Sequence, residues 1–342
     1  IKDPIMTKIY IYSVFAFFFI NLTMNAQENI NLNQNKLLGA LNPSFYGFKE
    51  APSIGVANTN QRISNEDSYI QNTFAFGSFY FEDYNFSVAL DVNSFQISAL
   101  GYKATQANVH YIHKTQLSYN WTMNASLSLG YGNNKLDFSS LIFGDQLDPF
   151  SGSITGFSID PATANNNIMY FDTGVSAHAH NNENMFFGLS VKHLNKPNIS
   201  LNNDSNDKKD IYISVQAGYE MDINPLGQSF LPEDSYLFFY SSFSKQASKS
   251  RISLYQEILL DNFSLGINQH LNSYKDSGLG AIGTSASVFF NQIEIGINYS
   301  FEIASKNITS IPYNHFEVYL VFDFSRISER YSRGANSRFS SF

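Results

Sequence analysis

The sequence contains no cysteine, a single tryptophan and few charged residues, which make up 15% of its 342 positions. Without cysteine, the chain has no disulfide framework, no thiolate metal site and no acylation site of a lipoprotein. Acidic residues outnumber basic ones by 29 to 21, so the formal net charge is −8. This charge argues against nucleic acid as a partner, because proteins that bind nucleic acid present a basic face.

The chain also lacks an apolar run long enough to cross a bilayer as a helix. The longest run, residues 9–22, is shorter than the ~20 residues that a spanning helix needs. Lys8 precedes this run and Ala26 follows it, which is the pattern of a secretory signal peptide. We expect translation to start at Met6 and cleavage to follow Ala26, so that residues 1–26 are upstream residues and signal peptide. A buried helix is the alternative interpretation.

What the sequence does contain is a repeated alternation of apolar and polar residues. In residues 292–304, every second residue is apolar, namely Ile293, Ile295, Ile297, Tyr299, Phe301 and Ile303. Successive side chains of a strand point to opposite faces, so this segment has one apolar face and one polar face. A strand of a soluble sandwich could show the same pattern. However, about a dozen further segments repeat it, and 32 Phe and 21 Tyr could supply aromatic girdles.

These features predict an all-β protein, a transmembrane antiparallel up-and-down β-barrel of about 14 strands that follows a cleaved signal peptide. We expect residues 27–52 to form a periplasmic lead-in that could tuck into the barrel mouth. Residues 53–325 would form the outer-membrane barrel, and residues 326–342 an Arg/Ser-rich tail. The strand candidates are 53–62, 68–81, 84–95, 103–118, 121–138, 168–181, 184–194, 210–221, 236–246, 250–260, 263–273, 278–290, 292–303 and 315–325.

The lengths of the connections support this count. Five tight connections fall on the predicted periplasmic side, and the long connections 139–167, 195–209 and 304–314 fall on the outside, as barrels require. The connection 222–235 is a long exception on the periplasmic side. The loop 139–167 is rich in Leu, Ile and Phe, which favours a lid over the mouth or a contact with a partner.

Assigning faces strand by strand places eight acids and two bases inside the barrel. Charged residues avoid lipid, so this placement is expected in any such barrel, and a cation-preferring passage follows only if the lumen is open. The inward charged residues are Asp91, Asp172, Glu220, Glu257, Glu294, Glu302, Glu317, Asp323, Lys192 and Arg251.

Few residues suggest chemistry. His178 and His180 share a strand face and could reach one metal ion, although two polar residues in a wet lumen is the plainer interpretation. Ser and Asn are too frequent for a triad to be singled out. No phosphate-binding, dinucleotide-binding or zinc-helix motif is present. We therefore predict no catalytic residue, no cofactor and no metal site.

Four segments resemble the PorP/SprF family of outer-membrane proteins of the type IX secretion and gliding machinery. Residues 42–47 (NPSFYG) are similar to the lead-in of the family, and residues 141–149 (LIFGDQLDP) to its loop motif. Residues 187–197 (FGLSVKHLNKP) resemble its strand end, and residues 316–324 (FEVYLVFDF) its closing strand. The resemblance covers nearly the whole mature chain, but the Arg-rich tail departs from the family pattern.

The resemblance implies a protein that is not an enzyme and is integral to the outer membrane of a Gram-negative bacterium. It implies a component of the type IX secretion and gliding machinery that aids secretion or surface anchoring of large proteins bearing a C-terminal sorting domain, gliding adhesins included. The implied partners are such a secreted protein or adhesin, other machinery subunits and outer-membrane lipid. The motif positions that could contact partners, or could merely build turns, are Phe143, Gly144, Asp145, Pro149, His193 and Pro197.

Two other functions compete with this one. A barrel of fourteen strands can enclose a lumen, so the chain could form a channel for small or hydrophobic solutes. An outer-membrane hydrolase is the third hypothesis, and no residue pattern recommends it.

Overall fold

The computed structural model shows how the alternating segments pair. The residues expected to form the signal peptide and the basic tail, 1–26 and 326–342, lie outside the residues that it describes. The described residues are 36–62, 68–137, 144–147, 153–154, 156, 158, 166–181, 183–200, 207–225, 227, 230–232, 235–247, 249–274, 276–303 and 314–324.

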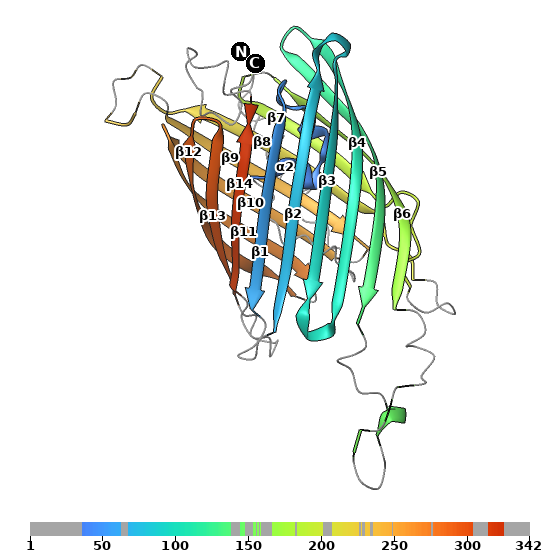
Figure 1. Ribbon diagram of the computed structural model, residues 1–342. Coiled ribbons are helices and arrows are strands. Elements are labelled where there is room, and N and C mark those ends of the chain that lie inside the picture. Colours follow the sequence, from blue (N-terminus) through green and yellow to red (C-terminus); the bar gives the residue numbers. More distant parts are fainter. Residues whose placement is uncertain are drawn as a thin grey trace, which may run out of the picture.

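Fourteen strands form one closed antiparallel barrel, in which each strand pairs with its neighbours in the sequence (Figure 1). The last strand closes the sheet by pairing with the first, from Ser53 opposite Asp323 to Gln61 opposite His315. The predicted up-and-down barrel is therefore confirmed, and every strand begins and ends within two residues of its predicted bounds.

The strands are β1 (Ser53–Arg62), β2 (Tyr69–Phe81), β3 (Phe86–Ile97), β4 (Tyr102–Ser118), β5 (Trp121–Leu136), β6 (Asn167–His180), β7 (Met185–Lys192), β8 (Tyr212–Asp222), β9 (Ser235–Gln246), β10 (Lys249–Leu260), β11 (Phe263–Tyr274), β12 (Asp276–Phe290), β13 (Ile293–Glu302) and β14 (Asn314–Asp323). The short helices are α2 (Leu38–Leu41), η2 (Pro43–Gly47), η3 (Glu82–Tyr84), η4 (Ser98–Leu100) and η6 (Gly144–Gln146). None of the helices in the described ranges is long and apolar enough to cross a membrane.

The period of two decides which face each strand residue occupies. On β13, Ile295 and Ile297 are exposed on the outer surface, whereas Glu294 and Asn298 are buried in the interior. The outer surface is therefore apolar, as a lipid-facing surface must be. The predicted inward acids that are buried are Asp91, Asp172, Glu220, Glu257, Glu294, Glu317 and Asp323, while Lys192 and Arg251 are half-buried and the side chain of Glu302 lies outside the described part.

The two ends of the barrel differ. We call the end that holds Ser53 and Asp323 the entry end, because the chain enters its first strand there, and the opposite end the loop end. At the loop end, η6 stands beyond the ends of β5 and β6 (Figure 1). At the entry end, the Asn224 amide donates to the carbonyls of Leu231 and Pro232 and so holds these described residues of the connection between β8 and β9 together.

Residues 36–50, which we call the inserted segment, lie inside the barrel (Figure 1). Pro43 starts η2, where its missing N–H costs nothing, and the Asn42 side chain caps the helix by accepting from the Ser44 N–H. Every residue from Gly39 to Phe48 is buried. Residues 36–50 of the expected lead-in, which could have tucked into the barrel mouth, therefore lie within the lumen.

The inserted segment supplies one half of an inner hydrophobic core, and inward side chains of the strands supply the other half. Leu37, Ala40, Leu41 and Tyr46 join one buried cluster, and Phe45 and Phe48 join a second, against which the partly buried Leu38 packs. The strand residues of these clusters are Ala57, Phe74, Ala89, Ile112, Tyr212 and Tyr319 in the first and Phe186, Phe238, Tyr240, Tyr255, Leu259 and Phe289 in the second.

Candidate functional site

The beginning of the inserted segment is tied to the wall by a buried lysine. Lys36 Nζ contacts the Glu257 carboxylate on β10 and lies 3.7 Å from Glu294 Oε1 on β13. The side chains of Lys36 and Glu257 are 1% and 0% exposed, so either charge without the other would be strongly destabilising. Two of the predicted inward acids thus face a cation from the chain itself.

The end of the inserted segment has a second set of ion pairs. Lys49 Nζ contacts the Asp323 carboxylate on β14, and Glu50 accepts from Lys114 on β4. The lysines of the segment therefore neutralise part of the acidic lumen.

Asn42 is the central polar anchor and is completely buried. Its Nδ2 donates to Gln216 Oε1 on β8 at 2.9 Å, and it lies within 3.4 Å of the carbonyls of Ala177 and Leu189. Gly188 on β7 lies directly beside this amide, and a Cβ there would be 2.7 Å from Asn42 Nδ2. A larger residue at position 188 would have to displace this amide or the Gln216 side chain.

Ser44 extends the anchor to His178 on β6. Ser44 Oγ lies 2.6 Å from Asn42 Oδ1 and 2.9 Å from His178 Nδ1. On the far side of the ring, Asn124 Nδ2 lies 3.2 Å from His178 Nε2. Since the Asn124 amide nitrogen can only donate, we assign the imidazole proton to Nδ1, which donates to Ser44 Oγ.

The two histidines singled out as a possible metal pair are covered by aromatic rings. His178 stacks on Phe45 with ring centroids 4.2 Å apart and planes at 8°, and His180 meets the edge of Phe48 at 5.0 Å. No group of three or more metal-ligating side chains occurs in the described part of the chain. The two imidazole rings form part of the barrel wall against which Phe45 and Phe48 of the inserted segment pack.

Tyr46 links the inserted segment to β3. Its hydroxyl donates to Asp91 Oδ2 at 3.1 Å, and His110 Nε2 lies 2.7 Å from the same oxygen. Burial, and then the neighbouring Asp91 charge, raises the pKa of Tyr46 well above its ordinary value, so the phenol is a neutral donor.

Asp91, His110 and Ser128 form an acid, imidazole and hydroxyl chain, with His110 Nδ1 2.8 Å from Ser128 Oγ. The same order of groups occurs in hydrolases. Here the chain borders a cavity of about 70 Å³ beneath the inserted segment. This volume holds a few water molecules and is far below the ~300 Å³ of a typical ligand pocket. The arrangement therefore fits a structural network better than a catalytic site.

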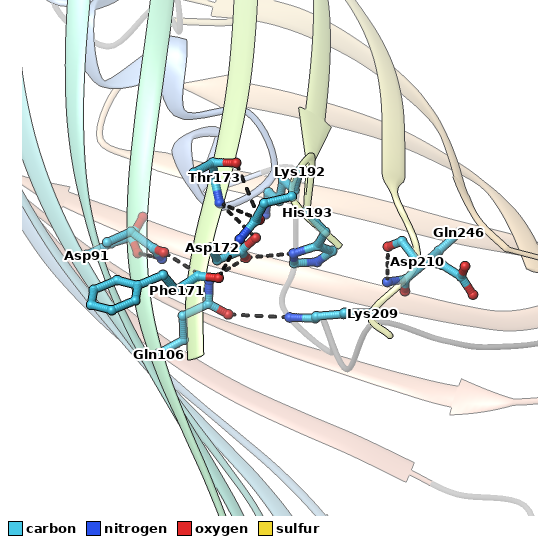
Figure 2. Close-up of polar contacts among 12 residues, drawn as sticks. Asp91, Gln106, Phe171, Asp172, Thr173, Lys192, His193, Lys209, Asp210 and Gln246 are labelled. Carbon is cyan, nitrogen blue, oxygen red and sulfur yellow. Dashed lines mark hydrogen bonds and ion pairs between the residues drawn. The ribbon is translucent and has the colours of Figure 1, made fainter. Parts of the chain in front are cut away.

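From Asp91, hydrogen bonds continue to the loop end of the barrel. Asn108 Nδ2 donates to Asp91 Oδ1 at 2.6 Å, and Gln106 Nε2 lies 3.0 Å from Asn108 Oδ1 and 2.9 Å from Asp172 Oδ2. Figure 2 shows Gln106 and His193 converging on Asp172, with His193 Nδ1 2.6 Å from Oδ2. A polar network thus runs from the inserted segment to His193.

His193 begins a turn that caps β6 beyond the end of β7. It has a φ of +61°, and the N–H of the next residue donates to the Thr173 carbonyl. The Asn195 side chain accepts from the Thr173 N–H and donates to the Phe171 carbonyl. The turn therefore satisfies the β6 backbone where strand pairing stops, and it aims the His193 ring into the lumen.

The structure brings some predicted site residues together and leaves others apart. His193 and the buried Pro197 belong to one turn, and the Pro197 carbonyl accepts from the Lys209 N–H. Asp145 lies far along the chain in η6 and accepts from Ser158 Oγ at 2.8 Å. Gly144 is also in η6, while Phe143 and Pro149 lie outside the described residues.

The residues that hold the inserted segment were missed as a set, although a signal for them exists. Residues 236–240 (YLFFY) and 185–187 (MFF) are continuous apolar runs in which alternation fails. A strand that is apolar on both faces is buried on both faces. Such runs indicate that something apolar fills the barrel at that level.

The chain is similar to a family of known proteins over most of its length. Residues 25–322 match the family model described as type IX secretion system membrane protein PorP/SprF. No curated protein matches the sequence.

Several solved outer-membrane structures are similar to the chain. The Acinetobacter baumannii outer membrane protein Omp33 is 10% identical over 81% of this chain and 100% of its own, with a TM-score of 0.45. The Pseudomonas putida toluene transporter TodX is 9% identical over 88% of this chain and 94% of its own, with a TM-score of 0.48. A COG4313 outer membrane channel from Pseudomonas putida F1 is 13% identical over 80% of this chain and 95% of its own, with a TM-score of 0.38.

Proposed function

Since the chain belongs to the PorP/SprF family of type IX secretion system membrane proteins, we propose that it aids the secretion or surface anchoring of large proteins with a C-terminal sorting domain. The chain is an integral protein of the outer membrane of a Gram-negative bacterium. Its proposed partners are the secreted protein or gliding adhesin and other subunits of the secretion machinery. We propose further that it acts without catalysis.

The observation that carries the proposal is the occupied lumen. The inserted segment is held by ion pairs to β10, β13, β14 and β4 and by hydrogen bonds to β3, β6 and β8. A barrel filled by its own chain is poorly suited to pass a large protein. It is well suited to serve as a rigid scaffold whose ends and outer surface contact other proteins.

The turn at residues 193–197 is the motif segment best placed for such a contact. Leu194, Asn195 and Lys196 are exposed, while His193 behind them is completely buried and bonded to Asp172. The exposed residues could meet a partner at the loop end while the buried ring keeps the turn in place.

The test is mild-detergent purification of the tagged protein from its own outer membrane, followed by mass spectrometry. We expect a large secreted protein with a sorting domain, or machinery subunits, in comparable amount. Deleting the gene should also remove particular proteins from the cell surface or the medium. An unchanged set of surface and secreted proteins, together with a barrel that purifies alone after crosslinking, would refute the proposal.

A channel for small or hydrophobic solutes is the second candidate. Cavities of about 130 and 70 Å³ flank the inserted segment, and displacement of the segment would join them into a passage. This function predicts conductance or solute uptake by the pure wild-type protein. A silent barrel in planar bilayers would exclude it.

A further inference from the structure

Two glutamines lie on the lipid-facing surface of the barrel. Gln256 on β10 stands between the inward residues Tyr255 and Glu257, which are 0% and 1% exposed, so its own side chain points outward. Gln269 on β11 follows the completely buried Asn268 and also points outward. Gln269 Nε2 donates to Gln256 Oε1 at 3.1 Å. The two side-chain amides are therefore hydrogen-bonded to each other on the outer surface of the barrel.

This pair lies within the apolar band and not at its edge. On the same face of β10, Gln256 is flanked by Leu254 and Ile258. On β11, Ile267 and Leu271 flank Gln269 in the same way. Small hydroxyl residues on the neighbouring strands enlarge the polar area, since Ser241 is paired with Leu254 and Thr284 with Ile267. We call Ser241, Gln256, Gln269 and Thr284 the amide patch.

Two of the other outward amides in the described strands lie near the edge of the apolar band. Asn58 on β1 is followed on its face by Asn60, and its amide donates to Thr73 Oγ1 at 2.8 Å. Asn133 on β5 is followed by Lys135. In both cases the next outward residue is polar, as expected where a strand leaves the hydrocarbon for the headgroups.

Lipid cannot satisfy the amide patch. A primary amide has two N–H donors and one carbonyl acceptor, and the hydrogen bond between the two glutamines uses one donor and one acceptor. The Gln256 NH2 group and the Gln269 carbonyl remain without a partner among the described residues. Hydrocarbon offers no hydrogen bond to either group, so exposing them to lipid is unfavourable. A protein surface that covers the patch would remove this cost.

We propose that the amide patch is the contact through which two copies of this chain associate side by side in the membrane. The pair presents both the free N–H donors of Gln256 and the free carbonyl acceptor of Gln269, so a second identical pair is chemically complementary to it. Such a self-complementary surface suits a two-fold dimer, in which each copy uses the same residues. The patch carries no charge, so it is poorly matched to a charged partner surface, and the aliphatic residues around it can pack against their own copies.

The absence of cysteine permits a direct test in native outer membranes. Ile267→Cys places a thiol beside the patch on β11, opposite Gln256 in the sheet, and leaves both glutamines intact. Oxidation with copper phenanthroline should give a disulfide-linked species of twice the mass of the barrel. Leu129→Cys on β5, which is 67% exposed on the outer surface, is the matched control and should stay monomeric.

A second variant distinguishes a specific contact through the amide patch from random collision of barrels in the membrane. Adding Gln256→Leu and Gln269→Leu to Ile267→Cys keeps side-chain size but removes the amides, and should lower dimer formation about tenfold. The barrel itself should fold as before, because leucine is preferred on a lipid-facing surface. Unchanged crosslinking in this variant, equal crosslinking through Leu129→Cys, or a crosslink to a protein of different mass would each overturn the proposal.

Discussion

Unseating the inserted segment should open the barrel, and the double variant Asn42→Ala/Phe45→Ala tests this most sharply. Phe45 is 7% exposed, stacks on His178 and meets the edge of Phe186 at 4.8 Å. Truncating a buried phenylalanine typically costs ~3–5 kcal/mol. This loss falls entirely on the state in which the segment is seated.

The Asn42→Ala substitution further destabilises the seated state, through the loss of buried hydrogen bonds. Its removal leaves Gln216 Oε1 and the Ser44 hydroxyl without their present partner inside the lumen. Each buried polar group left unsatisfied costs ~1–3 kcal/mol, although water entering the lumen will reduce this. Because the two side chains belong to one segment, the terms are not additive, and we expect a combined loss of ~5 kcal/mol. The ratio of unseated to seated molecules should then rise by roughly three to four powers of ten.

The assay is conductance of the purified protein in planar bilayers. The wild type should remain closed, and the double variant should show stepwise openings. Phe79→Ala is the matched control, since Phe79 lies on the outer face of β2 and is 51% exposed. Heat-modifiable mobility on gels should show that all three barrels are folded. A folded double variant that is as silent as the wild type would refute the view that these side chains hold the lumen closed.

Three further predictions concern single residues of the lumen. Gly188→Val should also give conducting barrels in planar bilayers, because a Cβ at this position would lie 2.7 Å from Asn42 Nδ2. A variant that conducts no more than the wild type would show that the barrel wall shifts and the inserted segment stays seated. Glu257→Gln should make Lys36 accessible to trypsin in intact barrels, since breaking a buried ion pair costs ~3–5 kcal/mol. Continued protection from trypsin would mean that the Glu294 carboxylate is enough to hold Lys36 in place. His193→Asn keeps a residue that tolerates a φ of +61° but has a shorter side chain, which no longer reaches the Asp172 carboxylate. The variant should lose ~1–3 kcal/mol of stability, and its barrel should unfold at a lower temperature in the gel-shift assay. An unchanged unfolding temperature would mean that the backbone hydrogen bonds alone hold the turn.

The strands were predictable because the environment of a membrane barrel is simple and repetitive. Lipid on one side requires an apolar residue at every second position, and this rule is visible in any ten residues, such as Ile293–Glu302. The same rule assigned Glu257 and Asp323 to the interior without knowledge of their partners. Turn residues between the segments then gave the strand count and the alternation of short and long connections.

The candidate site was predictable only in part. The motif at residues 187–197 was noted, but nothing in it indicated that His193 turns inward to meet Asp172 of another strand. The positive φ that aims the ring is not readable from residue type, because histidine rarely adopts it. The network from Tyr46 to His193 joins two family-motif segments that lie far apart in the sequence.

The sequence by itself determined the architecture, because the two-residue alternation of apolar and polar side chains is a local pattern set by strand geometry and by the bilayer. Only the tertiary structure decided what fills the lumen. The ion pair between Lys36 and Glu257 joins residues 221 positions apart, and it exists only once fourteen strands have closed around residues 36–50. Such a contact depends on the final register of the whole sheet, which no local pattern specifies.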